Sequence, residues 1–266
     1  MSIRLQTERR PIADCSAPEG SIAADVSRAD LHLHTALGDG MAGVGELLEY
    51  VEHQTQLDLI AITDHDQLEA GLAARELHAR RAAYRFEVIA GMEVTTIEGH
   101  LLVLGIEQPV PSFRSLASTL DAVHSQGGLC LIPHPMSWLT RSIGRNGIER
   151  ILARRAAGLW FDGIELSNQS PAGRVVAERV SQLNRDRFHL PAAGGSDAHY
   201  LPIVGTSYTV FPGEGLQGLR NALRDGTTRA ECGPTPSLAE LGYGQILRQS
   251  WRGLWATPRR VLRPPR

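Results

Sequence analysis

The sequence predicts an α/β fold built around a parallel sheet or barrel. From residue 28 to about residue 229, short apolar runs alternate with helix-length amphipathic stretches. Most of these runs are nearly continuous in leucine, isoleucine and valine, which is typical of strands covered on both faces. A chain of 266 residues is long enough for one large domain of this kind with tails. Strand and helix signals that alternate in this way favour parallel α/β architectures over helical hairpins and all-β sandwiches.

The individual elements follow from the same pattern. We expect strands at 29–35, 57–65, 86–96, 100–106, 128–134, 161–167, 189–197 and, more weakly, 205–211. We expect helices at 44–56, 67–83, 113–127, 146–157, 171–187 and 215–225. The chain therefore divides into an irregular or disordered lead-in, a globular domain and a basic tail, at residues 1–27, 28–230 and 231–266.

The tail has its own composition. Residues 241–266 contain six arginines and no acidic residue, and Trp251 and Trp255 are spaced to share one helical face. An anionic membrane surface or a nucleic acid would suit such a segment. The interpretation we favour is a docked helix followed by a disordered end.

Composition excludes several classes of function. The formal net charge is −2, which gives no support for nucleic-acid binding by the whole chain. No apolar run is long enough for a transmembrane helix, and the first twenty residues lack the apolar core of a signal peptide, so we expect a cytoplasmic protein. The three cysteines are far apart and suggest no disulfide framework. All 27 basic residues are arginine, which rules out Schiff-base and P-loop lysine chemistry.

Histidines and carboxylates cluster at the ends of the expected strands. In "DLHLHTALGDG", alternation along a strand would point His32 and His34 to one face and Leu31 and Leu33 to the other. Because the carboxyl ends of parallel strands meet at one edge, such residues would converge on a single mouth. The set contains six imidazoles and three carboxylates: His32, His34, Asp39, His65, Glu93, His100, His134, Asp197 and His199.

So many bases exceed what one proton transfer needs. Two or three divalent metal ions, each with several nitrogen and oxygen ligands, would use the whole set. The set contains no thiolate, which suits Mn, Zn or Fe bound by imidazole and carboxylate. The other four histidines lie in expected helices or at a strand start, and Asp66 is expected to cap the helix that follows it.

The motifs "DLHLHT…GDG", "AITDHD", "GMEVTT", "HP" and "GSDAH", in this order, resemble those of the polymerase-and-histidinol-phosphatase (PHP) domain. The resemblance covers about residues 28–230. It implies a distorted (β/α)7 barrel, similar to a TIM barrel, with a two- or three-metal site that hydrolyses phosphoesters. Among stand-alone members it is nearest to those acting on nucleotide 3′-phosphates. Those members often carry a long insertion before the HP motif, where this chain has forty residues.

The resemblance also implies roles for individual residues. The HxH pair falls on His32 and His34, the acid of the following turn on Asp39, and the TDH histidine on His65. The bridging glutamate falls on Glu93, and "HLLVLGI" looks like the stretch that supplies a further ligand, His100. The last ligands would be His134, Asp197 and His199. Of these nine, Asp39, Glu93 and His199 are the residues we expect to be catalytic.

The expected substrate is a small phosphorylated molecule. Arginines would neutralise its phosphate, and the candidates near the mouth are Arg141 and Arg145, with Asn168 as a further contact. Two alternatives stay open at this point. One is an amidohydrolase-like metal enzyme acting on C–N or C–O bonds, and the other is a non-catalytic module that binds a metal or a metabolite.

Overall fold

The computed structural model describes residues 26–81, 84–244, 246–249 and 251–252. The predicted lead-in, except its last two residues, and the last fourteen residues of the predicted tail lie outside this part of the chain. Within it, none of the helices combines the length and the apolar character needed to cross a bilayer.

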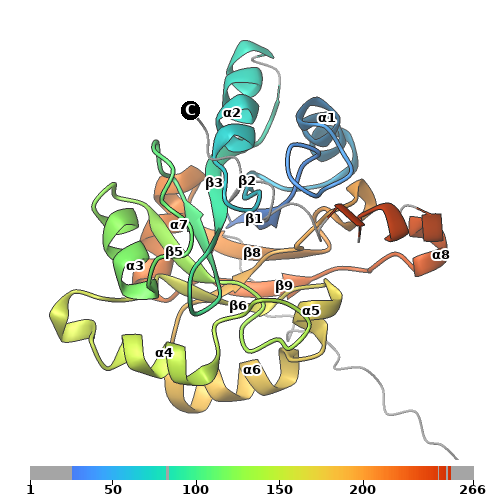
Figure 1. Ribbon diagram of the computed structural model, residues 1–266. Helices are drawn as coiled ribbons and strands as arrows, with labels where there is room; N and C mark the ends of the chain where they lie inside the picture. The colour runs from blue at the N-terminus through green and yellow to red at the C-terminus, as the bar shows by residue number, and fades with distance from the viewer. Residues whose placement is uncertain (1–25, 82–83, 245, 250, 253–266) are drawn as a thin grey trace, which may run out of the picture.

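The strands form one curled sheet, as Figure 1 shows. Their order in space is β7-β6-β5-β4-β3-β2-β1-β8-β9. All eight predicted strands are present, and a ninth, β9, is short and polar in sequence and was not predicted. The strands are β1 (Val26–Leu33), β2 (Leu59–Ile62), β3 (Glu87–Thr95), β4 (His100–Leu104), β5 (Leu129–Ile132), β6 (Gly163–Ser167), β7 (Ala192–Gly194), β8 (Ser207–Pro212) and β9 (Arg229–Cys232).

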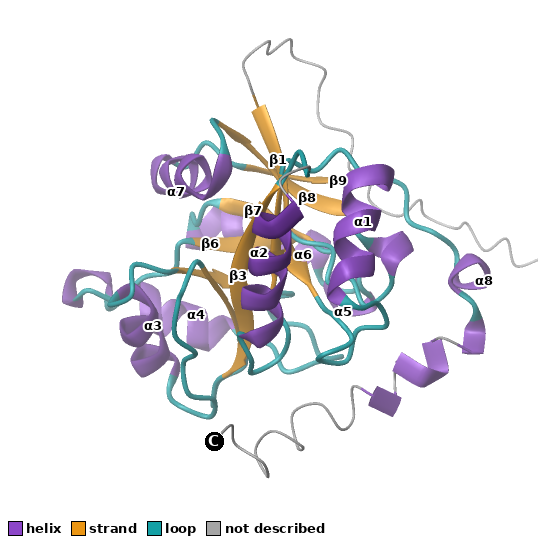
Figure 2. Ribbon diagram, turned by 90° about the horizontal axis from the view of Figure 1, so that it is seen from above, coloured by secondary structure: helices purple, strands orange, loops and turns teal. Residues whose placement is uncertain are grey.

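Helices lie around the outside of the strands (Figure 2). They are α1 (Val44–Gln54), α2 (Glu69–Arg81), α3 (Leu116–His124), α4 (Arg145–Leu152), α5 (Pro171–Arg174), α6 (Ala177–Leu183), α7 (Gly215–Asp225) and α8 (Leu238–Leu241). The helix predicted at 171–187 is divided into α5, α6 and a π-helical turn, Asn184–Phe188. The predicted α/β barrel is therefore confirmed, with the sheet nearly closed on itself.

The sheet is mixed rather than wholly parallel. β1, β2 and β3 pair in parallel, as do β5, β6 and β7. β4 pairs antiparallel to both β3 and β5, because a short loop, residues 96–99, turns the chain back without a crossover helix. β8 is also antiparallel to β1 and to β9. The reversed strand matters for the site, since it places the beginning of β4 beside the end of β3.

Apolar side chains form an inner core and two outer layers. The inner cluster includes Ile89 of β3, Leu102 of β4 and Phe211 of β8, together with one face of α7. One outer layer lies under α1 and α2, and the other under α3, α4 and α6. Leu33 packs in the layer under α1. Leu31 instead belongs to the inner cluster, because a register shift between Asp30 and Leu33 interrupts the alternation of β1.

The barrel closes where the backbone after β7 meets β1 and β8. Ala198 forms an isolated parallel bridge with Leu33, and Gly195 forms an antiparallel bridge with Tyr208. Gly194 donates its amide to Thr209 Oγ1 at 2.8 Å. A Cβ atom at Gly194 would lie 2.6 Å from the carbonyl carbon of Tyr208, so only glycine permits this approach.

We expect Gly194→Ala to destabilise the protein by about 1–3 kcal/mol, because the added methyl group would push β7 away from β8. Chemical denaturation of the purified protein measures the change. Gly233→Ala is the matched control, since a Cβ atom there would meet nothing within 4 Å. Equal stability of the two variants would show that the close approach at Gly194 is not needed.

Candidate metal centre

The nine residues of the sequence-derived set come together at one mouth of the barrel. β1 carries His32 and is followed directly by His34 and Asp39, while His65 follows β2. Glu93 lies in β3, and His134 follows β5. Asp197 and His199 follow β7. His100 is the first residue of β4, and it reaches the same mouth only because that strand runs antiparallel to its neighbours.

Glu93 is the centre of the arrangement. Its side chain is only 1% exposed, and five imidazoles surround its carboxylate. Oε1 lies 2.8 Å from His100 Nδ1 and 2.9 Å from His134 Nε2. Oε2 lies 3.1 Å from His65 Nδ1, 3.3 Å from His32 Nε2 and 3.5 Å from His34 Nε2. One carboxylate thus touches imidazoles from four different parts of the sheet.

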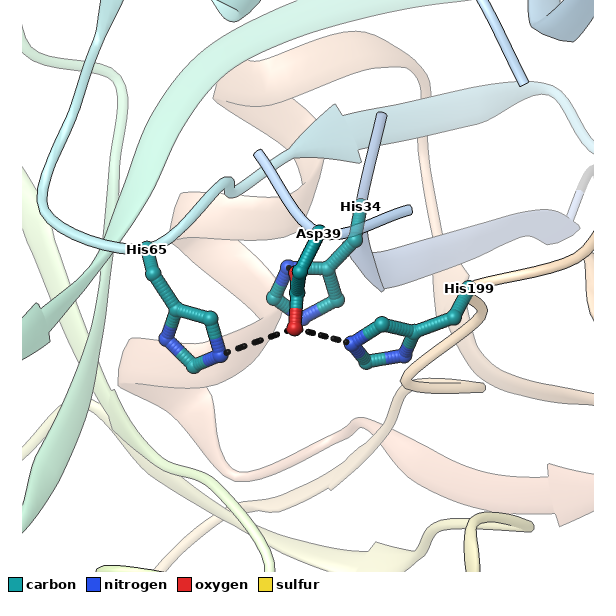
Figure 3. Close-up of side chains that lie close together, drawn as sticks. All are labelled: His34, Asp39, His65 and His199. Atoms are coloured by element: carbon teal, nitrogen blue, oxygen red, sulfur yellow. Dashed lines mark hydrogen bonds and ion pairs between the residues drawn. The ribbon is translucent and has the colours of Figure 1, made fainter. Parts of the chain in front are cut away.

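Two further carboxylates face the same imidazoles. Figure 3 shows Asp39 between His65 and His199, with His34 behind it. Asp39 Oδ2 lies 3.1 Å from His199 Nε2 and 3.9 Å from His65 Nε2. Asp197 Oδ1 lies 3.3 Å from His34 Nε2. The three carboxylates therefore contact overlapping sets of imidazoles.

The donor set fits divalent cations. Among the described residues, several buried polar atoms of this cluster make no hydrogen bond: both ring nitrogens of His34, Oδ1 of Asp39, Nδ1 of His65 and Nδ1 of His100. Buried polar atoms are normally satisfied, so these atoms point to a ligand. They fall into groups whose donor atoms all lie within 4.8 Å of one another: His34, Asp39, His65 and His199; His32, His134 and Asp197; His32, His34 and Glu93; and His65, Glu93 and His100.

The ionisation of Glu93, His34 and His100 suits metal binding. Burial alone would raise the pKa of Glu93, yet the surrounding imidazoles hold that pKa well below its usual range. Burial lowers the pKa of His34 and of His100, which favours the neutral, ligating form of each ring. Burial also opposes protonation of His199, but the Asp39 carboxylate outweighs it and raises the pKa of His199 to about 10. A bound cation would replace that proton in balancing the charge of Asp39.

Backbone conformation helps to aim two of these side chains. His134 has φ of 27° and Asp197 has φ of 55°, values that residues other than glycine adopt uncommonly. The strain persists because hydrogen bonds hold both neighbourhoods. His134 donates its amide to Glu165 Oε2 at 2.7 Å, and the next residue after Asp197 donates to the carbonyl of His32.

Glu165 is the main residue that the sequence pattern did not reveal. It lies in β6, is 3% exposed, and accepts a hydrogen bond from Asn168 Nδ2 at 2.7 Å. Its Oε1 lies 2.9 Å from His32 Nδ1, and its Oε2 holds the amide of His134. Glu165 thus orients two imidazoles from behind. The sequence offered one cue, since Glu165 is the one charged residue among the last five of "FDGIELS".

Asp66 does not cap α2, contrary to expectation. Its carboxylate accepts hydrogen bonds from the amide and hydroxyl of Thr95 and from the hydroxyl of Ser112. Because these partners lie at the end of β3 and in the loop before α3, Asp66 fastens the His65 loop to its neighbours. Asp64 fastens the loop after β2 to the loop after β1. It accepts hydrogen bonds from the amide and the hydroxyl of Thr35 at 2.7 and 2.5 Å.

A cavity of about 710 Å³ opens above the cluster. Arg141 lines it, 5.9 Å from the centre of the Phe113 ring, and Arg174 lines it as well. Arg145 is not among the lining residues, and it pairs with Glu149 along α4 at 2.9 Å. Asn168 is buried beneath the cavity and bonded to Glu165 and to the amide of Ser170. Arg141 therefore lines the cavity, whereas Arg145 and Asn168 do not.

Part of the chain matches a known protein family, and two related proteins match about half of it. The family model described as PHP-associated matches residues 179–228. An uncharacterized protein of Methanocaldococcus jannaschii is 28% identical over 155 residues, which cover 53% of this chain and 81% of that protein. The 5′-3′ exoribonuclease Rnm of Salmonella typhimurium is 32% identical over 157 residues, 56% of this chain and 47% of the exoribonuclease. The matched region is thus about half of that enzyme.

A solved structure shares the fold. It is a two-domain protein of Bacteroides vulgatus containing a predicted PHP-like metal-dependent phosphoesterase, with a TM-score of 0.62 and 20% identity. The match covers 79% of this chain and 65% of that one. Fold and site together define a distorted α/β barrel whose mouth carries a multi-histidine centre able to hold divalent metal ions. These matches support the resemblance to the PHP family that the motifs indicated.

We expect Mn²⁺ or Zn²⁺ added to metal-free protein to raise Tm, because the ion binds the folded state only. The expected gain is about 2.7 kcal/mol when free metal is about 100 times its Kd. Glu93→Ala removes the shared carboxylate and should abolish the shift in a thermal melt. Glu107→Ala, which removes an exposed carboxylate paired with Arg75, should keep it. No shift for the unmodified protein would contradict the metal assignment.

We expect Glu165→Gln to weaken metal binding about 10- to 100-fold, because the amide cannot accept from both His32 and the His134 backbone. Calorimetric titration with Mn²⁺ measures the change. Glu149→Gln, at an exposed carboxylate on α4, provides the control. Unchanged metal affinity in Glu165→Gln would show that Glu165 does not position His32 and His134.

Proposed function

We propose that this protein is a metal-dependent phosphoesterase that hydrolyses a small phosphorylated metabolite, with a nucleotide phosphate as one candidate. The observation that carries the proposal is the Glu93 carboxylate, which is buried among five imidazoles beneath a cavity with arginines on its wall. The names of the related exoribonuclease and of the structural neighbour support the same class of chemistry.

Two or three divalent ions, of Mn, Zn or Fe, would be held by the nine clustered residues. Glu93 would be shared between ions, because it belongs to two of the groups whose donor atoms lie close together. The bound ions would acidify water and offset charge on the phosphoryl oxygens, which is the chemistry that phosphoester hydrolysis needs at neutral pH. Asp39, Glu93 and His199 all line the cavity and are our candidates for contact with the reacting groups.

Arginine side chains would bind the phosphate of the substrate. Arg141 donates to the carbonyl of Thr96 at 3.4 Å, which leaves other N–H groups of its guanidinium to meet a phosphate. Arg174 lines the same cavity from α5 and is a second cation for the substrate. Arg141 replaces Arg145 as the favoured phosphate contact, because Arg145 is engaged by Glu149 outside the cavity. Lysine is absent from the chain, so guanidinium groups supply this charge.

The test is a phosphatase screen with metal-loaded protein. We expect hydrolysis of p-nitrophenyl phosphate, bis(p-nitrophenyl) phosphate or a nucleotide phosphate. Glu93→Ala and His34→Ala should each lower kcat by more than about 100-fold, since removing a ligand costs more than removing the group behind it. Wild-type turnover in both variants, or no hydrolysis by metal-loaded wild type, would refute the proposal.

A further inference from the structure

The C-terminal segment crosses the mouth of the barrel. We call the described residues between 234 and 252 the strap. Figure 1 shows this red part of the chain leaving β9, passing through α8 and turning back toward the loop that follows β1. Five of its side chains line the cavity above the metal centre: Thr235, Pro236, Leu241, Ile246 and Gln249. One wall of the cavity therefore comes from a segment that contributes none of the nine clustered residues.

The strap is fastened to loops on both sides of the mouth. Near its beginning, the hydroxyl of Thr235 donates to Gln169 Oε1, in the loop after β6, at 3.1 Å. At its end, Nη2 of Arg252 donates to the carbonyls of Ala36 and Gly38 at 2.7 and 3.1 Å. These carbonyls belong to the turn that carries Asp39. The strap thus spans from the β6 side of the mouth to the β1 side.

A third contact lies between these ends. Leu241 packs against the hydrophobic layer that contains Ile203, and Tyr200 packs against the same layer. Tyr200 and Ile203 themselves line the cavity, just after His199 in the chain. Two loops that border the metal centre are therefore hydrogen-bonded to the strap, and Leu241 packs on a hydrophobic layer to which a third loop contributes.

The strap wall is uncharged. Its cavity-lining side chains are apolar or neutral, while Arg252 is used to hold the turn and Arg248 is exposed and does not line the cavity. Proteins that bind a polynucleotide strand offer a continuous positive groove along its backbone. The cavity, of about 710 Å³, instead has the size typical of a site for one small ligand.

We infer that the strap is a specificity element that restricts the site to small phosphoesters and excludes the internal phosphodiesters of a nucleic-acid strand, and that Arg252 holds it in place. The inference rests on the phosphoesterase activity proposed above. It assigns to the chain's own C-terminal segment a role in choosing the substrate, and to Arg252 a role as a positioning residue for the Asp39 turn.

Arg252→Ala tests the inference, with Arg248→Ala as its matched control. Both variants lose one positive charge from the same segment, so simple electrostatics would weaken RNA binding equally in both. If the strap excludes RNA, Arg252→Ala alone should bind a fluorescein-labelled single-stranded RNA more tightly than wild type. The loss of two hydrogen bonds predicts a change of about tenfold by fluorescence anisotropy. Thr235→Val, which releases the other end, should change binding in the same direction.

Two further measurements accompany the binding assay. The ratio of kcat/KM for the RNA to that for bis(p-nitrophenyl) phosphate should rise about tenfold in Arg252→Ala and stay unchanged in Arg248→Ala. Hydrogen exchange of the Ala36 and Gly38 amides should speed up in Arg252→Ala only, because their turn loses its anchor.

The outcomes separate the two proposals. Equal RNA binding by Arg252→Ala and Arg248→Ala, or efficient cleavage of internal RNA bonds by wild type, would overturn the role of the strap. Failure of wild type to hydrolyse any phosphoester would overturn the proposed function, whereas RNA binding and hydrogen exchange would still decide whether the strap closes the mouth.

Discussion

The structure depends on the burial of the Glu93 carboxylate among five imidazoles. A buried charge is costly unless partners compensate it, and here four of the five partners come from distant parts of the chain, while His100 comes from the strand next in sequence. His32 lies on β1 and His34 directly follows it, His65 follows β2, His100 begins β4, and His134 follows β5. The charge can be compensated only after the sheet has curled, so folding and formation of the metal centre are linked.

The inner face of the sheet serves two purposes along its length. On β3, Ile89 belongs to the inner core and Glu93, two alternations later, belongs to the site. On β4 the order is reversed, because the strand is antiparallel: His100 lies at the mouth, and Leu102 and Leu104 follow into the core. The floor of the site is therefore the close-packed interior, which limits the movement of its side chains.

Hydrogen bonds connect the loops above this floor to one another and to neighbouring segments. Asp64 and Arg252 both bind the turn that carries Asp39, one from the β2 side and the other from the C-terminal segment. Asp66 ties the His65 loop to β3, and Glu165 holds the backbone of His134. Carboxylates and a guanidinium behind the imidazoles thus set the geometry of loops that would otherwise be free to vary.

The sequence by itself determined the α/β class, eight of the nine strands and the set of histidines and carboxylates, because apolar periodicity and strand-end placement are local properties. It did not reveal the antiparallel course of β4, which alone brings His100 to the mouth. Nor did it reveal the left-handed backbone at His134 and Asp197, the support from Glu165, or the path of the segment ending at Arg252. Only the tertiary structure decided these features. The course of β4 depends on how residues 96–99 turn, and the others depend on partners dozens of residues away, whose approach no local pattern encodes.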